Sequence, residues 1–186
     1  MENNKSFRLP KKFTEQWLEA LKSGEYTQLS GSLILYRTEE GDYNEELGIF
    51  EDDVVLQCDT KQCCCLGVAA VMLGATAEEV GGHDMPNDMD TPVLTRINYP
   101  KELYEKDNTK SNKLEDILAQ LNDGNFSYKN YEDYLREYPD LKFSIVPTKS
   151  TEENSYDPIK YSFEEIADFI KDNVELYEED VRDEGI

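Results

Sequence analysis

Apolar residues recur every three or four positions in several stretches of the chain, and this spacing predicts amphipathic helices. The stretches expected to be helical are residues 11–23, 112–122 and 129–138, and a last helix that begins after Ser162. In that last helix, Ser162 and Glu165 have the spacing of a capping box, and Tyr161 and Ile166 have that of a hydrophobic staple. Each helix therefore has one apolar face to bury against a common core.

A fifth stretch, residues 64–73, contains no charged residue and ends before Gly74. A helix that is apolar on all sides has to be surrounded by other elements. We therefore expect this helix to be the central element of the core. Thr76 and Glu79 follow it with the spacing of a second capping box.

Extended segments complete the pattern. Residues 32–38 and 54–58 are rich in β-branched and large apolar residues and predict two antiparallel strands, and residues 93–97 and 143–146 are further candidate strands. Strands and helices do not alternate regularly, which argues against a parallel α/β sheet. The expected fold class is α+β, with a small antiparallel sheet packed against the central buried helix and further amphipathic helices.

Length and cysteine usage limit the class of protein. The 186 residues predict a single domain, in which residues 178–186 form an acidic tail expected to fray. No stretch approaches the roughly 18–20 apolar residues of a membrane span, and the first residues lack the apolar centre of a signal peptide. Three of the four cysteines are adjacent, which predicts reduced thiols and a cytoplasmic location.

Charge changes the picture most. The formal net charge is −22, and the segment from Glu39 to Asp53 holds eight acids and no base. Residues 152–184 hold a further thirteen acids. Such a surface repels phosphate backbones, so direct nucleic-acid binding is disfavoured, and it favours fast, salt-sensitive association with a basic protein.

The adjacent cysteines are the candidate site for covalent chemistry. Cys64 or Cys65 at a helix N-terminus would feel the helix dipole, which lowers a thiol pKa, and His83 is the single histidine that could act as base. A zinc site built from Cys58, Cys63, Cys64 and His83 is a weaker alternative, because the spacing is not that of paired zinc knuckles. The simpler interpretation is that the cysteines pack as small apolar residues, with no metal and no cofactor.

Tyrosines gather in the second half of the chain among acidic residues. Tyr131 and Tyr134 lie on the short helix expected over residues 129–138. Tyrosine offers rigid contact area with a polar tip and is enriched at protein interfaces. These two residues are therefore candidate contacts for a partner, although tyrosines in this segment can equally pack beneath it.

Four short motifs occur in order along the chain: W-x-x-A-L-x-S-G-x-Y-x-Q from Trp17, C-C-L-G-V from Cys64, L-N-D from Leu121 and S-F-x-E-I-A-D-x-I from Ser162. In this order they resemble an uncharacterised family of small proteins from tailed bacteriophages. The resemblance implies a phage origin and a shared core, and it assigns no catalytic residue. Relative to that family, residues 125–160 look like an insertion between the L-N-D motif and the final helix. For a phage protein with reduced thiols, we expect action in the host cytoplasm. We expect the motif residues to be scaffold, including Trp17, Cys64, Cys65, Leu66, Leu121 and Ile166.

The leading functional hypothesis is a non-enzymatic accessory protein that binds and inhibits or redirects a host protein. In its sharper form, carboxylates mimic DNA phosphates in the site of a defence or nucleic-acid-processing protein. The candidate carboxylates are those of Glu39, Glu40, Asp42, Glu45, Glu46, Glu51, Asp52 and Asp53. The alternatives are a cysteine-dependent enzyme using Cys64 or Cys65 with His83, and a binder of a small ligand such as a nucleotide signal.

Overall fold

The computed structural model describes residues 5–39, 43–44, 49–50, 54–104, 111–148 and 159–178. Its α-helices are α1 (Lys11–Lys22), α2 (Cys65–Met72), α3 (Ala77–Val80), α4 (Thr91–Arg96), α5 (Ser111–Asp123), α6 (Tyr128–Glu137) and α7 (Phe163–Asn173), with short 3₁₀ turns η1 (Pro86–Asp88) and η2 (Lys101–Leu103). Its strands are β1 (Phe7–Pro10), β2 (Thr27–Gln28), β3 (Ile34–Glu39), β4 (Tyr43–Asn44), β5 (Ile49–Phe50), β6 (Val54–Cys63) and β7 (Val174–Tyr177). This is the α+β class that the sequence predicts.

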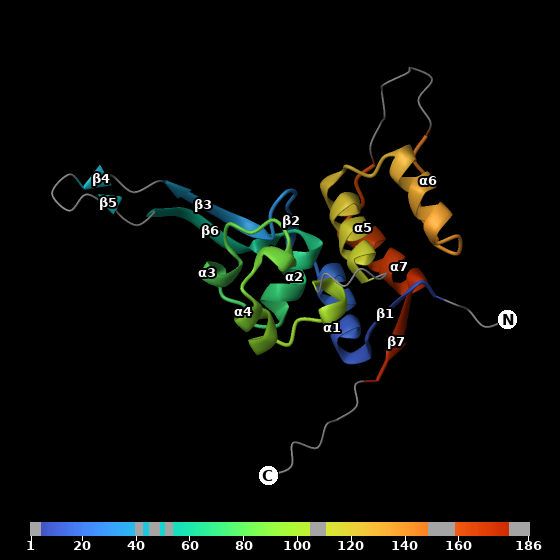
Figure 1. Ribbon diagram of the computed structural model, residues 1–186, viewed down its shortest axis with the longest axis horizontal. Helices are drawn as coiled ribbons and strands as arrows, with labels where there is room; N and C mark the ends of the chain where they lie inside the picture. Colours follow the sequence, from blue (N-terminus) through green and yellow to red (C-terminus); the bar gives the residue numbers. More distant parts are fainter. Residues whose placement is uncertain are drawn as a thin grey trace, which may run out of the picture.

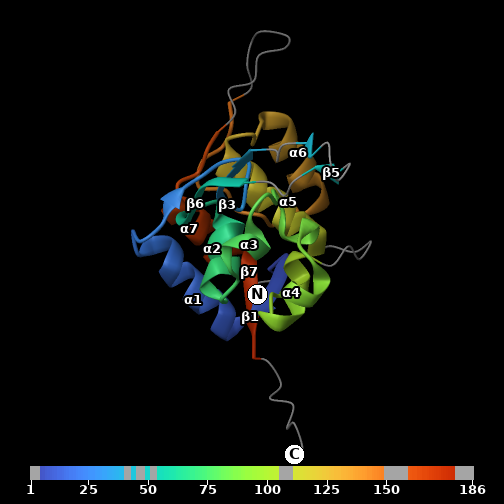
Figure 2. The same ribbon diagram turned by 90° about the vertical axis from the view of Figure 1, so that its left-hand side faces the viewer.

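Helix α2 lies at the centre of the core, as its uncharged sequence predicts. It packs against α1 and α5, and α7 packs against the same two helices (Figures 1 and 2). Six of its eight residues are buried, from Cys65 to Ala70. The helix thus has no solvent face of any width, and the amphipathic helices around it turn their apolar sides inward.

The main sheet has the order β2-β6-β3. Strands β3 and β6 are antiparallel, which confirms the predicted pairing, while β2 adds a short parallel pair at the end of β6. Strand β6 is ten residues long, where the sequence predicts a strand over residues 54–58 only. Beyond β2 the two long strands continue as a hairpin that projects from the helical body (Figure 1), and this projecting pair is called the arm below.

A second sheet joins the two ends of the described chain. Strands β1 and β7 pair in parallel, with Phe7 opposite Val174 and Pro10 opposite Tyr177. Each strand has only four residues, and the two are separated by most of the sequence. Local periodicity cannot reveal such a pairing, because neither segment is long enough to show alternation by itself.

Two predicted strands are wrong. Residues 93–97 lie largely in helix α4, which has proline near its first position and buries Leu94. Residues 143–146 form no strand, because the hydroxyl of Tyr161 accepts a hydrogen bond from the Ile145 amide (2.9 Å) and donates one to the Ile145 carbonyl (2.7 Å). A side chain here takes the place of a neighbouring strand.

The described part of residues 125–160 is packed into the same core as the rest of the chain. Phe143 stacks on Phe126 with ring centroids 4.9 Å apart and meets Phe169 of α7 at 5.2 Å. The amide of Asn173, also on α7, binds both the N–H and the carbonyl of Lys142, at 2.8 and 2.9 Å. Aromatic packing and this amide clamp therefore attach the segment to α7. The predicted acidic tail lies outside the described residues beyond Glu178.

Candidate functional site

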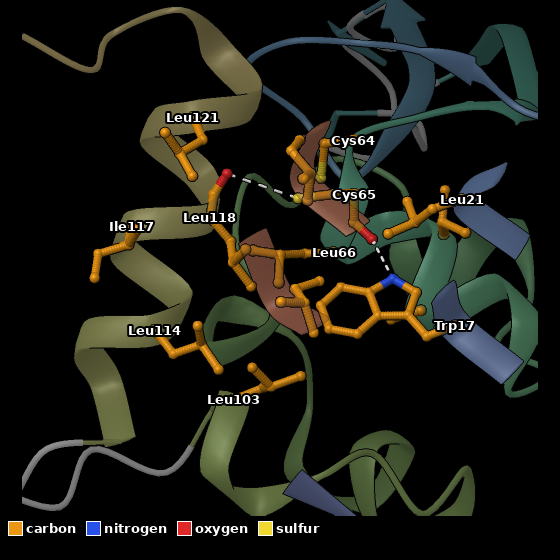
Figure 3. Packing of buried hydrophobic residues seen from close by; sticks show 14 of the residues in the cluster. Trp17, Leu21, Cys64, Cys65, Leu66, Leu103, Leu114, Ile117, Leu118 and Leu121 are labelled. Atoms are coloured by element: carbon orange, nitrogen blue, oxygen red, sulfur yellow. Dashed lines mark hydrogen bonds between the residues drawn. The ribbon is translucent and has the colours of Figure 1, made fainter. Parts of the chain in front are cut away.

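Three of the four sequence motifs meet at the N-terminus of α2. The indole N–H of Trp17, on α1, donates to the carbonyl of Cys65 at 2.9 Å (Figure 3). The thiol of Cys65 donates to the carbonyl of Leu118 on α5, at 3.7 Å. The first turn of α2 is thereby tied to a helix on each side, and Trp17 and Cys65 are fully buried.

Asn122, the central residue of the L-N-D motif, is the hub of this junction. Its side-chain oxygen accepts from the amide of Cys65 (3.1 Å) and from the side chain of Gln28 (3.1 Å). Its side-chain nitrogen donates to the carbonyl of Leu29 (2.7 Å) and to the carboxylate of Asp123 (2.8 Å). Asn122 is 0% exposed, so each of these bonds replaces one that water would otherwise make.

The last motif, which begins at Ser162, lies next to these contacts in the fold. Gln28, which ends the first motif, donates to the carbonyl of Tyr161 at 2.7 Å, directly before the N-cap of α7. An ion pair between Lys22 and Asp168 (2.6 Å) joins α1 to α7 at the surface. The first motif thus contacts each of the other three, at Cys65, Asn122 and Asp168.

The glycine of the C-C-L-G-V motif is required by a close approach. A Cβ atom on Gly67 would lie 1.8 Å from the carbonyl oxygen of Leu33, the residue before β3. The amide of Cys64 donates to the same carbonyl at 3.1 Å. The root of the arm therefore rests directly on the backbone of α2.

The cysteines are arranged for packing. Cys63, Cys64 and Cys65 are buried, and the thiol of Cys64 caps α2 by accepting from the amide of Gly67 at 3.3 Å. Burial raises the pKa of Cys63 and of Cys64 to about 12, and it raises the pKa of Cys65 well above its usual value. The expected lowering of the thiol pKa is wrong, because desolvation of the thiolate outweighs the N–H groups at the helix terminus.

His83 is not positioned as a base for these thiols in the described part of the chain. It lies in the loop after α3, where its carbonyl accepts from the amide of Leu33 at 2.9 Å. None of the hydrogen bonds of the described residues joins its imidazole to a cysteine. Among those residues no group of three or more metal-ligating side chains comes together, and Cys58 stands apart as an exposed residue on β6.

One of the predicted acidic contact residues lies in the described part of the arm. Glu39 ends β3, and the other seven candidates, Glu40, Asp42, Glu45, Glu46, Glu51, Asp52 and Asp53, lie outside the described residues. Between them the short strands β4 and β5 pair antiparallel, with Tyr43 opposite Phe50. The acidic sequence thus belongs to the connection between the two strands of the arm.

The two candidate tyrosines of α6 have different environments. Tyr134 is 8% exposed, stacks on Phe126 and accepts a hydrogen bond from the side chain of Gln120, so its ring belongs to the core. Tyr131 is half-buried and meets Phe143 edge-on at 5.4 Å. Tyr131 alone of the two presents part of its ring to solvent.

Sequence reasoning named the motif residues as scaffold, and their burial confirms this for Trp17, Cys64, Cys65, Leu66, Leu121 and Ile166. It did not identify Asn122 and Gln28 as the polar centre of the junction. The sequence did contain a signal for this polar centre. The first motif ends in Gln28 and the L-N-D motif has Asn122 at its centre, and amide side chains are unusual where a motif serves apolar packing.

The fold and the contacts around the N-terminus of α2 define the class: an α+β protein whose motif residues hold its core together. Comparison with known proteins found no matching family model, no matching curated protein and no matching solved structure. Among the described residues no helix is both long and apolar enough to cross a membrane.

Proposed function

We propose that this protein is a non-catalytic phage accessory protein that binds a basic host protein and inhibits or redirects it. The observation that carries the proposal is the arm. Strands β3 and β6 project from the helical body (Figure 1), and the 14 residues that join them contain seven acids and no base. A projecting acidic hairpin can reach into a basic groove that a flat surface could not enter.

The way in which the arm is anchored supports this role. Its root contacts α2 at Gly67 and the residue after α3 at Gly81, where a Cβ atom would lie 2.4 Å from the ring of Tyr36. The amides of Leu33 and Cys64 are hydrogen-bonded across the same root. A well-anchored root limits the conformational entropy that strands β3 and β6 can lose on binding.

Burial of the thiols weakens the enzymatic alternative. A cysteine nucleophile acts as thiolate, and the raised pKa values of Cys63, Cys64 and Cys65 keep these thiols protonated at neutral pH. The polar groups of the motif residues are also used in hydrogen bonds within the fold. The surface charge is then the strongest feature left for function, and a nucleic-acid site on the partner is the kind of basic groove that an acidic arm would occupy in place of DNA.

The test is capture of host proteins by the full chain, eluted with a salt gradient and identified by mass spectrometry. We expect a basic nucleic-acid-binding protein that elutes at moderate salt, and whose DNA binding this protein inhibits in a competition assay with purified components. A variant with all eight carboxylates from Glu39 to Asp53 changed to amides should neither bind nor inhibit.

The matched control removes the same number of charges elsewhere, at exposed positions Glu15, Glu19, Glu78, Asp88, Asp90, Asp140, Glu164 and Asp172. This control variant should retain most of the affinity for the captured partner, because its changes reduce only the general attraction between the acidic protein and a basic one. Equal loss in both variants, or an affinity that does not change with salt, would rule out the arm as the contact.

A further inference from the structure

Tyr128 of α6 has a second tyrosine and a glutamate as its neighbours on the helix. Tyr131 and Glu132 lie three and four residues after Tyr128, so each of them is a neighbour of Tyr128 on the helix surface. The two rings have centroids 6.1 Å apart at an angle of 41°, and the carboxylate of Glu132 raises the pKa of Tyr128. Helix α6 lies at the periphery of the helical body (Figure 1).

Tyr131 is held rigidly by the core below it. Its ring meets Phe143 edge-on at 5.4 Å, and Phe143 in turn packs on Phe126 and Phe169. A half-buried aromatic ring fixed in this way loses little freedom when a partner covers it. This is the property of the aromatic anchors found at protein interfaces.

Glu132 differs from the other acidic residues of α6. Asp133 is paired with Arg136 at 2.9 Å, and Glu137 is paired with Lys113 at 3.7 Å. Glu132 is exposed and forms no ion pair within the described part of the chain. A partner's cation at this position would therefore meet a carboxylate that is not already neutralised.

Two other tyrosines of this protein each have a cationic side chain over the ring. Lys61 lies over the ring of Tyr26 at 4.6 Å, and Arg8 lies over the ring of Tyr177 at 5.3 Å. Among the described residues no cation lies over Tyr131. A ring face beside an exposed carboxylate is the combination that recognises a cation.

We propose that Tyr128, Tyr131 and Glu132 bind an arginine side chain of the basic partner. The inference rests on the proposed function and adds a second contact surface to the arm. Arginine fits better than lysine, because its planar guanidinium can stack on a tyrosine ring while its N–H groups reach a carboxylate. Tyr134 takes no part, since its ring is buried.

The test uses the full chain and an acetylated Gly-Arg hexapeptide repeat as probe. Binding is followed by NMR of the tyrosine ring signals, with Tyr131 assigned from its Phe variant. We expect the Tyr131 signal to shift on titration, and the same peptide with neutral citrulline in place of arginine to leave it unchanged.

Two matched charge variants decide the site. Glu132→Gln should weaken peptide binding by about fivefold, while Glu164→Gln, which removes one exposed carboxylate from α7, should change it by less than about twofold. Tyr131→Phe should retain binding because the ring remains, and Tyr131→Leu should lose it.

Equal weakening by Glu132→Gln and Glu164→Gln would overturn the site and leave only general attraction to a negative surface. So would an unchanged Tyr131 signal, or equal binding of the citrulline peptide. Any of these results leaves the proposed function intact, because that proposal is tested separately, by the salt dependence of partner binding and by the comparison of the arm variant with its charge-matched control.

Discussion

At the scale of single residues, the described interior is organised by a few polar groups among many apolar ones. Asn122 is fully buried and links α5 to α2, to β2 and to the loop after β2. Apolar packing alone would hold these elements together in several registers. Directional hydrogen bonds from one amide select one of them.

We therefore expect Asn122→Ala to lower the free energy of unfolding by about 3 kcal/mol, because it leaves the buried amide of Cys65 and the carbonyl of Leu29 without partners. The measurement is urea unfolding followed by circular dichroism. Asn125→Ala, at an exposed position three residues later, should cost less than about 0.5 kcal/mol. A loss no larger than that of the control would contradict the role of the hub.

Burial also determines the reactivity of the thiols. In the native protein, iodoacetamide at about pH 8 should alkylate Cys58, the exposed cysteine, and leave the other three unmodified until urea unfolds the chain. Peptide mass spectrometry identifies the modified positions. Fast alkylation of Cys64 or Cys65 in the folded protein would instead support the alternative hypothesis of a cysteine-dependent enzyme.

The same pKa shifts predict a loss of stability at alkaline pH. The pKa of Cys63 and of Cys64 is about 12 in the folded protein against 9.0 for an ordinary thiol, so the unfolded chain releases protons that the folded chain retains. Their contribution is complete below pH 9 and is lost as the pH rises from 9 towards 12. Urea midpoints measured across this range should fall, and Cys63→Ala should make the fall shallower.

At the scale of elements, sequence signals located the helices closely wherever a cap was present. All three capping boxes of the described helices form, at Thr76, Ser127 and Ser162, and the sequence predicts the first and third of them. The short extended segments were harder to predict from the sequence. Residues 93–97 have an apolar pattern that fits a strand or one helical turn, and proline near the start decided for the helix.

The cap of α7 should have a measurable effect. Ser162 accepts from the amide of Glu165, and the Glu165 carboxylate accepts from the Ser162 amide at 2.7 Å. Ser162→Ala should lower the free energy of unfolding by about 1 kcal/mol in a urea titration. Ser162→Thr keeps the hydroxyl and serves as control, with a loss of a few tenths of a kcal/mol at most. If both variants unfold like the parent, the box does not stabilise α7.

At the scale of the whole molecule, charge has the largest influence. A formal net charge of −22 on 186 residues makes the folded chain repel itself, since folding brings the acids closer together. The ion pairs of the described residues are largely at the surface, with both partners partly exposed, and offset little of this repulsion.

Salt should therefore stabilise the protein. We expect the urea midpoint to rise as sodium chloride increases, since the screening length falls from about 10 Å at 0.1 M to about 3 Å at 1 M. The variant with eight carboxylates of the arm changed to amides should show a smaller rise. A midpoint that is unchanged or falls with salt would show that self-repulsion does not limit stability.

The sequence by itself determined the fold class, the central helix, most helix boundaries and the antiparallel arm, because these depend on local periodicity, caps and turns. Only the tertiary structure decided the parallel pair of β1 with β7, the junction at Asn122, and which tyrosine is buried. Each of these depends on residues far apart in the chain, such as Gln28 with Tyr161, whose meeting no local pattern encodes. The same reason explains the thiols, since the sequence predicts a helix N-terminus at Cys64 but burial in the folded core raises the pKa of its thiol.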